Sequence, residues 1–304
     1  MQIGVDLGAT KIESIVLDDK GQELHRSREN SPSNYLETID SINLIVNKIE
    51  KKFNKKINIG VCHPGSSSVE TGLLKNAHNS PWLNDKNFNL DISKKLNKNV
   101  LCENDANCFA LSEALDGSAQ HYNIVFGIIL GSGCGGGLII NKKIVAGPNN
   151  LAGEWGHNFL PFFGNFKDEK FNINDKYQKT IENYLSGKGL ERLFFKTYSA
   201  KFSAKEIFNN AIRKKDKRCA EFIERFKDRL SRSLSLLINT IDPEAIVSGG
   251  GVSNEIKFLD EIKKMTEKWL NEKKINTVFL KPKYGDASGV RGAARLGRNI
   301  NLTK

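Results

Sequence analysis

The 304-residue sequence lacks any apolar run that approaches the roughly 18 residues of a membrane span, so we do not expect it to cross a membrane. Its first dozen residues already contain an aspartate and a lysine, which is not typical of a signal peptide. Glycine (26) and proline (7) are too scarce, and apolar residues (39%) too frequent, for a disordered or fibrous chain. These absences predict a soluble, cytoplasmic, folded protein of about two domains.

Cysteine is also scarce, with five residues at Cys62, Cys102, Cys108, Cys134 and Cys219. The number is odd, and no two of them form a C-x-x-C pair. Both a secreted disulfide framework and a zinc ribbon are therefore excluded as interpretations. We expect reduced thiols that are mostly buried.

The formal net charge of +11 raises the question of a nucleic-acid partner. The basic residues are interspersed with acidic ones, as in EKKFNKK and IRKKDKR, and no basic arm or aromatic-interleaved stripe is present. We interpret the charge as a lysine-rich solvated surface and expect neither nucleic acid nor a membrane as partner. A basic cleft for a polyanionic small molecule is the alternative.

Apolar periodicity predicts the organisation of the first part of the chain. Three short runs near residues 3–7, 13–17 and 23–28 predict a β-meander. Apolar residues at helical spacing over residues 36–49 predict a helix of about 18 residues. A strand in INIGVCHPG follows, and then a short strand at residues 100–102 that leads into a helix in ENDANCFALSEAL.

The same pattern then restarts, which predicts a duplicated architecture. The strand IVFGIIL, the glycine turn GSGCGGG and two further strands are followed by a helical region at about 183–242 and the strand IVSGGG. A strand at 277–279 and a small-residue helix at about 289–300 close the chain. We predict α/β domains at 1–117 and 118–304, with the last helix packed back on the first domain.

Three glycine turns follow predicted strands: residues 8–11, 131–137 and 249–251. Such turns expose backbone N–H groups that cradle phosphate, although tight hairpins need glycine for structural reasons alone. None of them fits the P-loop or the dinucleotide-binding fingerprint. Asp6 precedes the first turn, and a carboxylate in a phosphate loop is useful chiefly when it holds Mg²⁺.

Two polar motifs complete the set of candidate residues. In Glu103-Asn104-Asp105, an aspartate at a strand-to-helix junction suits a base for phosphoryl transfer to an alcohol, whereas a plain helix cap is the structural alternative. The run GEWGH, which contains Glu154 and His157, supplies a carboxylate and an imidazole suited to sugar hydroxyls. A lone histidine is more often structural.

Together these motifs resemble the ROK family (repressors, open reading frames and sugar kinases) of the actin-like ATPase and hexokinase superfamily. The resemblance extends over essentially the whole chain and is carried by VDLGATK, KNAHNSPWL, ENDANCFALSEALDG, ILGSGCGGG, LAGEWGHNFLP, IENYLSG, VSGGGVSN and GDASGVRGAA. It implies a two-domain α/β fold of the ribonuclease H-like type, with duplicated βββαβα-type units. Within the family the chain looks most similar to bacterial fructokinases and mannokinases, and next to N-acetylglucosamine kinases.

The resemblance also implies roles for individual residues. Asp105 would accept the proton of the sugar hydroxyl. The sugar hydroxyls would be held by Gly65, Asn79, Asn104, Glu154, His157 and Glu182. The ATP phosphates would be held by Gly8, Thr10, Lys11, Gly131, Ser132 and Gly133. Gly249 and Gly250 would lie near the adenosine, and Asp6 and Asp105 would face Mg²⁺.

The sequence departs from the family pattern at three places. Ala9 replaces the middle glycine of the first loop, and His63 stands where a small or aliphatic residue is usual. Family members carry three cysteines that bind a structural zinc with the histidine matching His157, and those positions are here Ile173, Asp175 and Thr180. A four-ligand zinc site cannot be completed, so we expect no zinc and a polar loop over residues 162–180.

The expected activity is ATP- and Mg²⁺-dependent phosphorylation of a hexose, with D-fructose converted to fructose 6-phosphate by a homodimer. Kinases of N-acetylglucosamine, mannose or glucose are alternatives within the family. A non-catalytic sugar sensor or a transcriptional regulator is the alternative from another class. Regulators of the family carry a winged helix-turn-helix ahead of the phosphate loop, and the position of Asp6 leaves no room for one.

Overall fold

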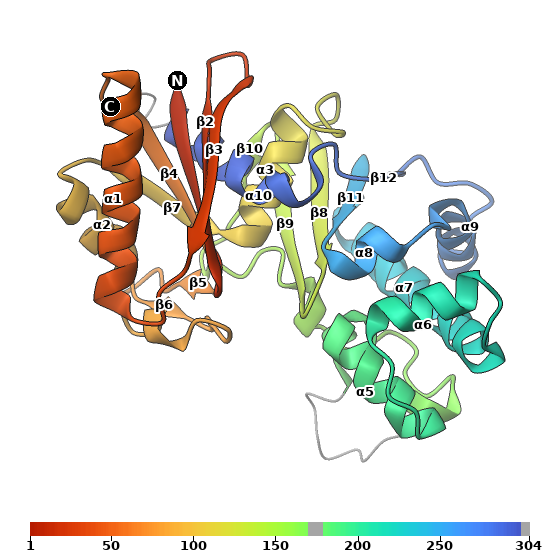
Figure 1. The fold of residues 1–304 in the computed structure, drawn as a ribbon. Helices are drawn as coiled ribbons and strands as arrows, with labels where there is room; N and C mark the ends of the chain where they lie inside the picture. Colours follow the sequence, from red (N-terminus) through yellow and green to blue (C-terminus); the bar gives the residue numbers. More distant parts are fainter. Residues whose placement is uncertain (170–178, 299–304) are drawn as a thin grey trace. The chain divides into compact units, whose positions relative to one another are not determined.

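The computed structural model describes residues 1–169 and 179–298, which form two compact units. The first unit comprises Met1–Gln120, Gly137–Ala152 and the chain from Asp286, and the second comprises His121–Gly136 and Gly153–Gly285. Figure 1 labels their helices and strands. The division of the sequence into domains 1–117 and 118–304 stays a prediction.

The first unit is built on a five-stranded sheet with the strand order β3-β2-β1-β4-β7. Its strands are β1 (Gln2–Leu7), β2 (Lys11–Leu17), β3 (Glu23–Asn30), β4 (Asn58–His63) and β7 (Val100–Asn104). The first three strands pair antiparallel, which confirms the predicted meander, and β4 and β7 add in parallel. The carboxyl ends of β1, β4 and β7 therefore meet at one edge of the sheet.

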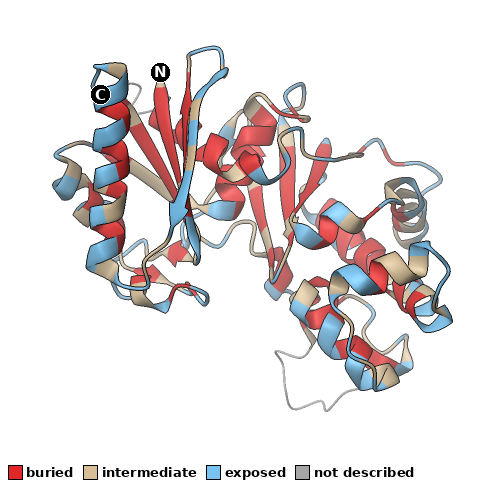
Figure 2. Cartoon of the chain, in the orientation of Figure 1, coloured by how far each residue is buried: buried red, intermediate tan, exposed pale blue. Residues whose placement is uncertain are grey.

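Four helices belong to this unit: α1 (Tyr35–Phe53), α2 (Phe88–Leu96), α3 (Asp105–Leu115) and α10 (Ser288–Arg298). The side chain of Asn34 caps α1 by accepting hydrogen bonds from the backbone N–H groups of Leu36 and Glu37. One apolar face of α1 is buried, as the periodicity predicted, while its other face is exposed (Figure 2). The unit also contains the short elements β5 (Ser66–Ser67), β6 (Leu74–Lys75) and η1 (Pro81–Leu83), and η5 (Gly285–Ala287) spans the point in the chain where the second unit ends.

Helix α10 lies so close to its neighbours that only glycine fits at several contacts. A Cβ atom on Gly292 would lie 1.8 Å from the carbonyl oxygen of Cys108 in α3, and one on Gly60 of β4 would lie 2.0 Å from the carbonyl oxygen of Ala293. Arg291 and Arg295 of α10 also pair with Asp116 at the end of α3. Helix α10 is thereby held against β4 and α3 of the same unit.

The second five-stranded sheet has the order β10-β9-β8-β11-β12. Its strands are β8 (Ile124–Leu130), β9 (Cys134–Ile140), β10 (Lys143–Ile144), β11 (Ala245–Gly249) and β12 (Val278–Leu280). In this sheet β11 pairs in parallel with β8, and β12 pairs in parallel with β11. The first sheet has the same arrangement, with β4 parallel to β1 and β7 parallel to β4. The repeated strand order confirms the predicted duplication.

The helical region predicted after residue 183 consists of four helices, followed by two more beyond β11. They are α4 (Ile181–Leu185), α5 (Gly187–Tyr198), α6 (Ala204–Ile212), α7 (Lys217–Ile241), α8 (Gly251–Glu255) and α9 (Leu259–Trp269). Helix α7 packs against α6 and α9 and buries most of its length. Among the described residues ahead of these helices are the short 3-10 turns η2 (Trp155–His157) and η3 (Lys167–Glu169). No helix in the described parts of the chain combines the length and apolar character that crossing a membrane requires.

All five cysteines carry free thiols, and four of them are buried while Cys102 is half-buried. Burial raises the pKa of Cys102, Cys108, Cys134 and Cys219. A contact with Cys108, followed by burial, raises the pKa of Cys62. The expectation of reduced, mostly buried thiols is confirmed.

Candidate active site

The first glycine turn joins β1 to β2 at the carboxyl end of β1. The backbone N–H of Gly8 donates a 3.0 Å hydrogen bond to the carbonyl oxygen of Lys11, which closes the hairpin. Thr10 and Lys11 are exposed beyond this bond, and Ala9 is half-buried. The turn therefore presents a hydroxyl and an ammonium group to solvent, two donors of the kind that contact phosphate.

Asp6, one residue before the end of β1, is half-buried in a cluster of polar groups that also contains the buried Glu13 and the exposed Arg28. The Cys62 thiol of β4 donates a 2.9 Å hydrogen bond to its Oδ1 atom. In the sheet register Asp6 lies beside Glu13, which lies beside Arg28, and Arg28 pairs with Glu13 at 2.6 Å. Burial raises the pKa of Asp6, and the charge of Glu13 adds to this effect while Arg28 opposes it. Sequence reasoning missed this cross-strand row because its members are separated along the chain.

At the junction between β7 and α3, the neighbouring residues Asn104 and Asp105 have different roles. Asn104 is the helix cap, because its Oδ1 accepts a 2.7 Å hydrogen bond from the backbone N–H of Asn107. Asp105 is the first residue of α3 and is exposed, with its Oδ1 accepting from the backbone N–H of Ala106 at 2.8 Å. The structural alternative of a helix cap therefore holds for Asn104, and the exposed carboxylate belongs to Asp105.

Two of the predicted sugar ligands lie between β4 and η1. Gly65 has a φ angle of +80°, and a Cβ atom there would lie 2.4 Å from the carbonyl oxygen of Lys75. Asn79 lies in the exposed turn that follows β6. The unusual His63 is buried edge-on against Phe88, and burial lowers its pKa to about 4, so it is neutral at pH 7. His63 is therefore a core residue.

The glycine turn of the second unit is held by residues some fifty positions away. The backbone N–H of Gly131 donates to the carbonyl oxygen of Gly133 at 2.9 Å, and that of Gly187 donates to the carbonyl oxygen of Gly131 at 2.7 Å. Glu182 of α4 accepts a 2.9 Å hydrogen bond from the backbone N–H of Cys134. Ser132 is exposed at the tip. Sequence reasoning did not assign Gly187, although the motif IENYLSG contains it.

The turn that carries Glu154 and His157 follows Gly153, which has a φ angle of +97°. The buried Trp155 anchors this turn by donating a 2.8 Å hydrogen bond to the carbonyl oxygen of Gly135. His157 Nδ1 lies 3.4 Å from a carboxylate oxygen of Glu154, and the two side chains are 58% and 29% exposed. The structure thus brings a solvent-accessible imidazole and a carboxylate together on one short turn.

The third glycine turn follows β11. Gly249 pairs in the parallel register with Ile129 of β8, so the two glycine turns of the second unit lie at the carboxyl ends of neighbouring strands. Gly250 has a φ angle of +91°, and a Cβ atom there would lie 2.6 Å from the carbonyl oxygen of Leu130. In open α/β sheets ligands bind outside the carboxyl ends of parallel strands.

The carboxylates of the first unit fit a Mg²⁺ ion of the kind that nucleotides carry. Such ions are held by one or two carboxylates, with water and phosphate oxygens as the other ligands. Asp6 and Asp105 are both near enough to Cys108 to raise the pKa of its thiol. Within residues 1–169 and 179–298 no group of three His, Cys, Asp or Glu side chains is arranged to hold a metal. A pair of carboxylates is the number of protein ligands that Mg²⁺ usually has when it binds together with a nucleotide.

Of the positions that match the family zinc ligands, residues 173 and 175 lie outside the described residues. Thr180 forms an isolated bridge with Phe159, and its hydroxyl accepts a 3.1 Å hydrogen bond from Asn183. The expected lack of zinc stays a prediction.

We expect the purified protein to contain no stoichiometric zinc, because alkyl, carboxylate and hydroxyl groups stand where three thiolates are needed. A zinc-selective chelator that leaves Mg²⁺ in place should change neither activity nor the melting temperature. Elemental analysis of the untreated protein is the matching measurement. About one zinc per chain, lost together with stability, would contradict this expectation.

Comparison with solved structures defines the class of protein. The chain is similar to the ROK hexokinase from Thermus thermophilus, with a TM-score of 0.86, 21% identity and 99% of both chains covered. It is also similar to a ROK family glucokinase from Streptomyces griseus, solved with glucose and AMPPNP, with a TM-score of 0.76 and 26% identity over 98% and 99% of the two chains. The fold is that of the actin-like ATPases and hexokinases, as predicted.

Comparison of sequences gives the family. The profile of the ROK family matches residues 2–300. The N-acetyl-D-glucosamine kinase of Mannheimia succiniciproducens is 38% identical over 97% of this chain and 99% of its own, and that of Histophilus somni is 36% identical over 97% and 98%. The chain belongs to the ROK family and is a sugar kinase, which confirms the predicted resemblance. The preference for fructose finds no support in these relatives.

Proposed function

We propose that this protein transfers the γ-phosphoryl group of ATP to a hydroxyl of N-acetyl-D-glucosamine. The observation that carries the proposal is the set of curated relatives, eight of which are named N-acetyl-D-glucosamine kinases and are 34–38% identical over 97% of this chain. Sequence motifs had predicted fructose first and N-acetylglucosamine next. The relatives reverse that order.

The residues proposed to bind the sugar are assigned from the family motifs, and some of them occur in each unit. The first unit contributes Gly65, Asn79 and Asn104, and the second contributes Glu154, His157 and Glu182. The mixture of carboxylates, imidazole and amides suits a polyhydroxylated ligand, because carboxylates accept from hydroxyl groups while amides both donate and accept. The accessibility of Glu154 and His157 supports this assignment.

Asp105 is the proposed base. Its carboxylate accepts the proton of the attacking hydroxyl as the sugar oxygen bonds to the γ-phosphorus, and the bond to the β,γ-bridging oxygen breaks to release ADP. The exposure of Asp105 at the start of α3 supports this role, because a base must reach the substrate proton. The capping bond of Asn104 fixes the junction from which Asp105 projects.

Each of the three glycine turns is proposed, within its own unit, as an element that binds nucleotide. Thr10 and Lys11 would meet the phosphates with the backbone N–H of Gly8, as would the turn formed by residues 131–133, and Gly249 and Gly250 would lie near the adenosine. Mg²⁺, when bound, neutralises charge on the phosphate oxygens, and Asp6 and Asp105 would hold it. Preorganised N–H donors at a phosphate contribute without a reorganisation cost during the reaction.

A coupled kinase assay across N-acetylglucosamine, N-acetylmannosamine, glucose, mannose and fructose tests the substrate. We expect kcat/KM for N-acetylglucosamine to exceed that for fructose at least tenfold, which is about 1.4 kcal/mol of transition-state binding. A tenfold preference for fructose would restore the motif-based prediction. Phosphorylation of none of these sugars would favour a sugar sensor. Sedimentation of the same preparation tests the homodimer that the family resemblance implies.

A further inference from the structure

Helix α7 buries two arginines that the proposed reaction does not use. Arg229 and Arg232 are both 0% exposed, and they meet Asp168 and Glu169 of the short turn η3. Arg229 lies 2.6 Å from Asp168 and 3.0 Å from Glu169, and Arg232 lies 2.5 Å from Glu169. These four residues form the α7 ion-pair cluster. Asp168 and Glu169 are buried residues in the described part, 162–169, of the predicted polar loop 162–180.

Glu169 is the centre of the cluster, because its two carboxylate oxygens bind different parts of the molecule. Oε1 accepts hydrogen bonds from both arginines of α7. Oε2 accepts from the backbone N–H of Gly164 at 3.0 Å and from that of Phe166 at 3.5 Å. The Glu169 side chain therefore hydrogen-bonds both to the backbone of its own loop, residues 164–166, and to the arginines of α7.

The arginines make further contacts with the same segment. Arg232 donates to the carbonyl oxygens of Pro161 and Phe162 at 2.7 and 3.1 Å. The guanidinium of Arg229 lies over the ring of the fully buried Tyr184 in α4, 5.0 Å from its centroid. The cluster thus touches both the loop that begins at residue 161 and the helix that carries Glu182.

Residues 158–160 and residues 179–181 are hydrogen-bonded to each other through their backbones, next to the proposed sugar ligands His157 and Glu182. The backbone N–H of Ile181 donates to the carbonyl oxygen of Asn158 at 2.9 Å, and that of Leu160 donates to Lys179 at 2.8 Å. Asn158 directly follows His157, and Ile181 directly precedes Glu182. The backbone next to His157 is therefore hydrogen-bonded to the backbone next to Glu182, and Tyr184 of the same helix α4 contacts Arg229 of the cluster.

Stability alone does not account for such a cluster. Removing charges from water is costly, and packed apolar residues of similar volume often stabilise a core as well or better. Buried ion pairs instead demand one geometry, since each displaced partner leaves an uncompensated charge. Resting on the proposed function, we infer that the α7 ion-pair cluster is a positioning device that sets sugar affinity by fixing residues 161–169 and helix α4, which carries Glu182.

The test compares Glu169→Gln and Arg229→Lys with the wild type in steady-state kinetics, well below each melting temperature. Glutamine removes the charge while keeping the shape, and lysine cannot bridge two carboxylates as the arginine fork does. We expect KM for the sugar to rise about tenfold in each variant while kcat changes less than about threefold, because a displaced binding segment costs affinity. Calorimetric titration of the sugar should show the same loss.

Glu50→Gln is the matched control. Glu50 is 7% exposed, pairs with Lys56 and Lys98, and accepts from the backbone N–H of Ile57, but it lies on α1 of the first unit. We expect it to lower the melting temperature and leave KM unchanged. If the two cluster variants do the same, with sugar KM within twofold of the wild type, the cluster is only structural and the inference is wrong.

A replacement variant and the choice of sugar allow the kinetic test to give a clear result. Asp168→Asn removes the two ion pairs of Asp168, with Arg229 and Arg225, on the more exposed side of the cluster and replaces any variant that fails to fold. The sugar used is the one that the wild type phosphorylates best, so failure of the N-acetylglucosamine proposal appears in the wild-type assay. Failure of the positioning role appears only in the ratio of variant to wild type.

Discussion

Replacing Asp105 by asparagine is expected to lower kcat by roughly 10²–10⁴-fold, the usual contribution of a positioned general base. The amide cannot accept the hydroxyl proton, so the attacking oxygen stays protonated until later in the reaction. Because Asn retains an oxygen that can accept from the backbone N–H of Ala106, the start of α3 should be preserved. Steady-state kinetics and calorimetric sugar titration measure the two properties separately.

Asp260→Asn is the control for this experiment. Asp260 is also an exposed carboxylate in the first turn of a helix, α9, and it has no proposed role in the reaction. Its substitution should leave kcat within about twofold of the wild type, since surface changes of this kind have small effects. Near-normal turnover of Asp105→Asn would assign the base to another residue.

A large loss of stability is expected when Gly292, where α10 packs against α3, is replaced by alanine. A methyl group there would lie 1.8 Å from the carbonyl oxygen of Cys108, which is backbone and cannot move aside alone. Overpacking of this kind costs about 1–3 kcal/mol or more, which outweighs the roughly 1 kcal/mol that alanine gains over glycine inside a helix. We expect Gly292→Ala to lower the melting temperature by roughly 5 °C or more.

Gly251→Ala provides the comparison, because a Cβ atom at Gly251 would have no atom within 4 Å. Its melting temperature should equal or slightly exceed that of the wild type, as measured by differential scanning calorimetry. An unchanged melting temperature for Gly292→Ala would mean that α10 and α3 do not approach as closely as described.

The local part of the fold was predictable because its signals lie within short stretches of sequence. Apolar periodicity predicted the meander and the helix of residues 36–49, which the structure shows as β1, β2, β3 and α1. Two further strands are predicted after the glycine turn 131–137, but the second of them, β10, consists only of Lys143 and Ile144. Strand ends depend on the neighbouring strand, and a single sequence carries no such information.

The α7 ion-pair cluster could not be predicted for a related reason. Its carboxylates and arginines are separated by about sixty residues, and no periodicity connects them. In the sequence Asp168 and Glu169 are charged residues in a polar stretch, for which exposure is the usual expectation. Only the fold shows that they are buried against α7.

The preferred sugar was the weakest part of the sequence interpretation. Asn104, Glu154, His157 and Glu182 were assigned from motifs that the resemblance implies for kinases of several sugars. Hydrogen-bonding groups of this kind recognise hydroxyls in general, whereas discrimination between sugars depends on the shape of the surrounding site and on polar groups left unpaired by the wrong substrate. Short motifs do not describe that shape.

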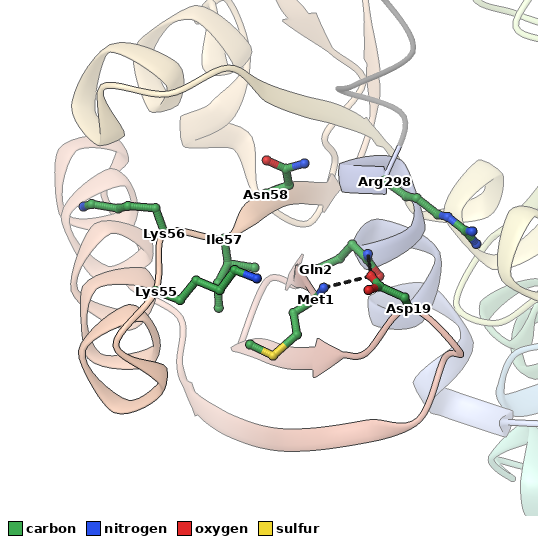
Figure 3. A pocket seen from close by; sticks show the side chains of 8 residues that line it. All are labelled: Met1, Gln2, Asp19, Lys55, Lys56, Ile57, Asn58 and Arg298. Atoms are coloured by element: carbon green, nitrogen blue, oxygen red, sulfur yellow. Dashed lines mark hydrogen bonds and ion pairs between the residues drawn. The ribbon is translucent and has the colours of Figure 1, made fainter.

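A pocket outside the assigned residues illustrates why volume alone does not locate the reaction. A cavity of about 540 Å³ lies at the amino ends of β1 and β4, and Met1, Gln2, Asp19, residues 55–58 and Arg298 line it (Figure 3). The Met1 amine pairs there with Asp19 at 2.9 Å. None of the predicted site residues lines this pocket, and it lies at the opposite ends of the strands from Asp6 and Asp105. The assignment of the site therefore depends on its chemistry.

The raised pKa values of the five thiols give the protein its own unfolding probes. A protonated, buried thiol reacts slowly with a colorimetric disulfide reagent, because the thiolate is the reactive form. Cys62, Cys102 and Cys108 belong to the first unit and Cys134 and Cys219 to the second. Mass-resolved labelling kinetics can therefore follow the opening of each unit separately, without any engineered label.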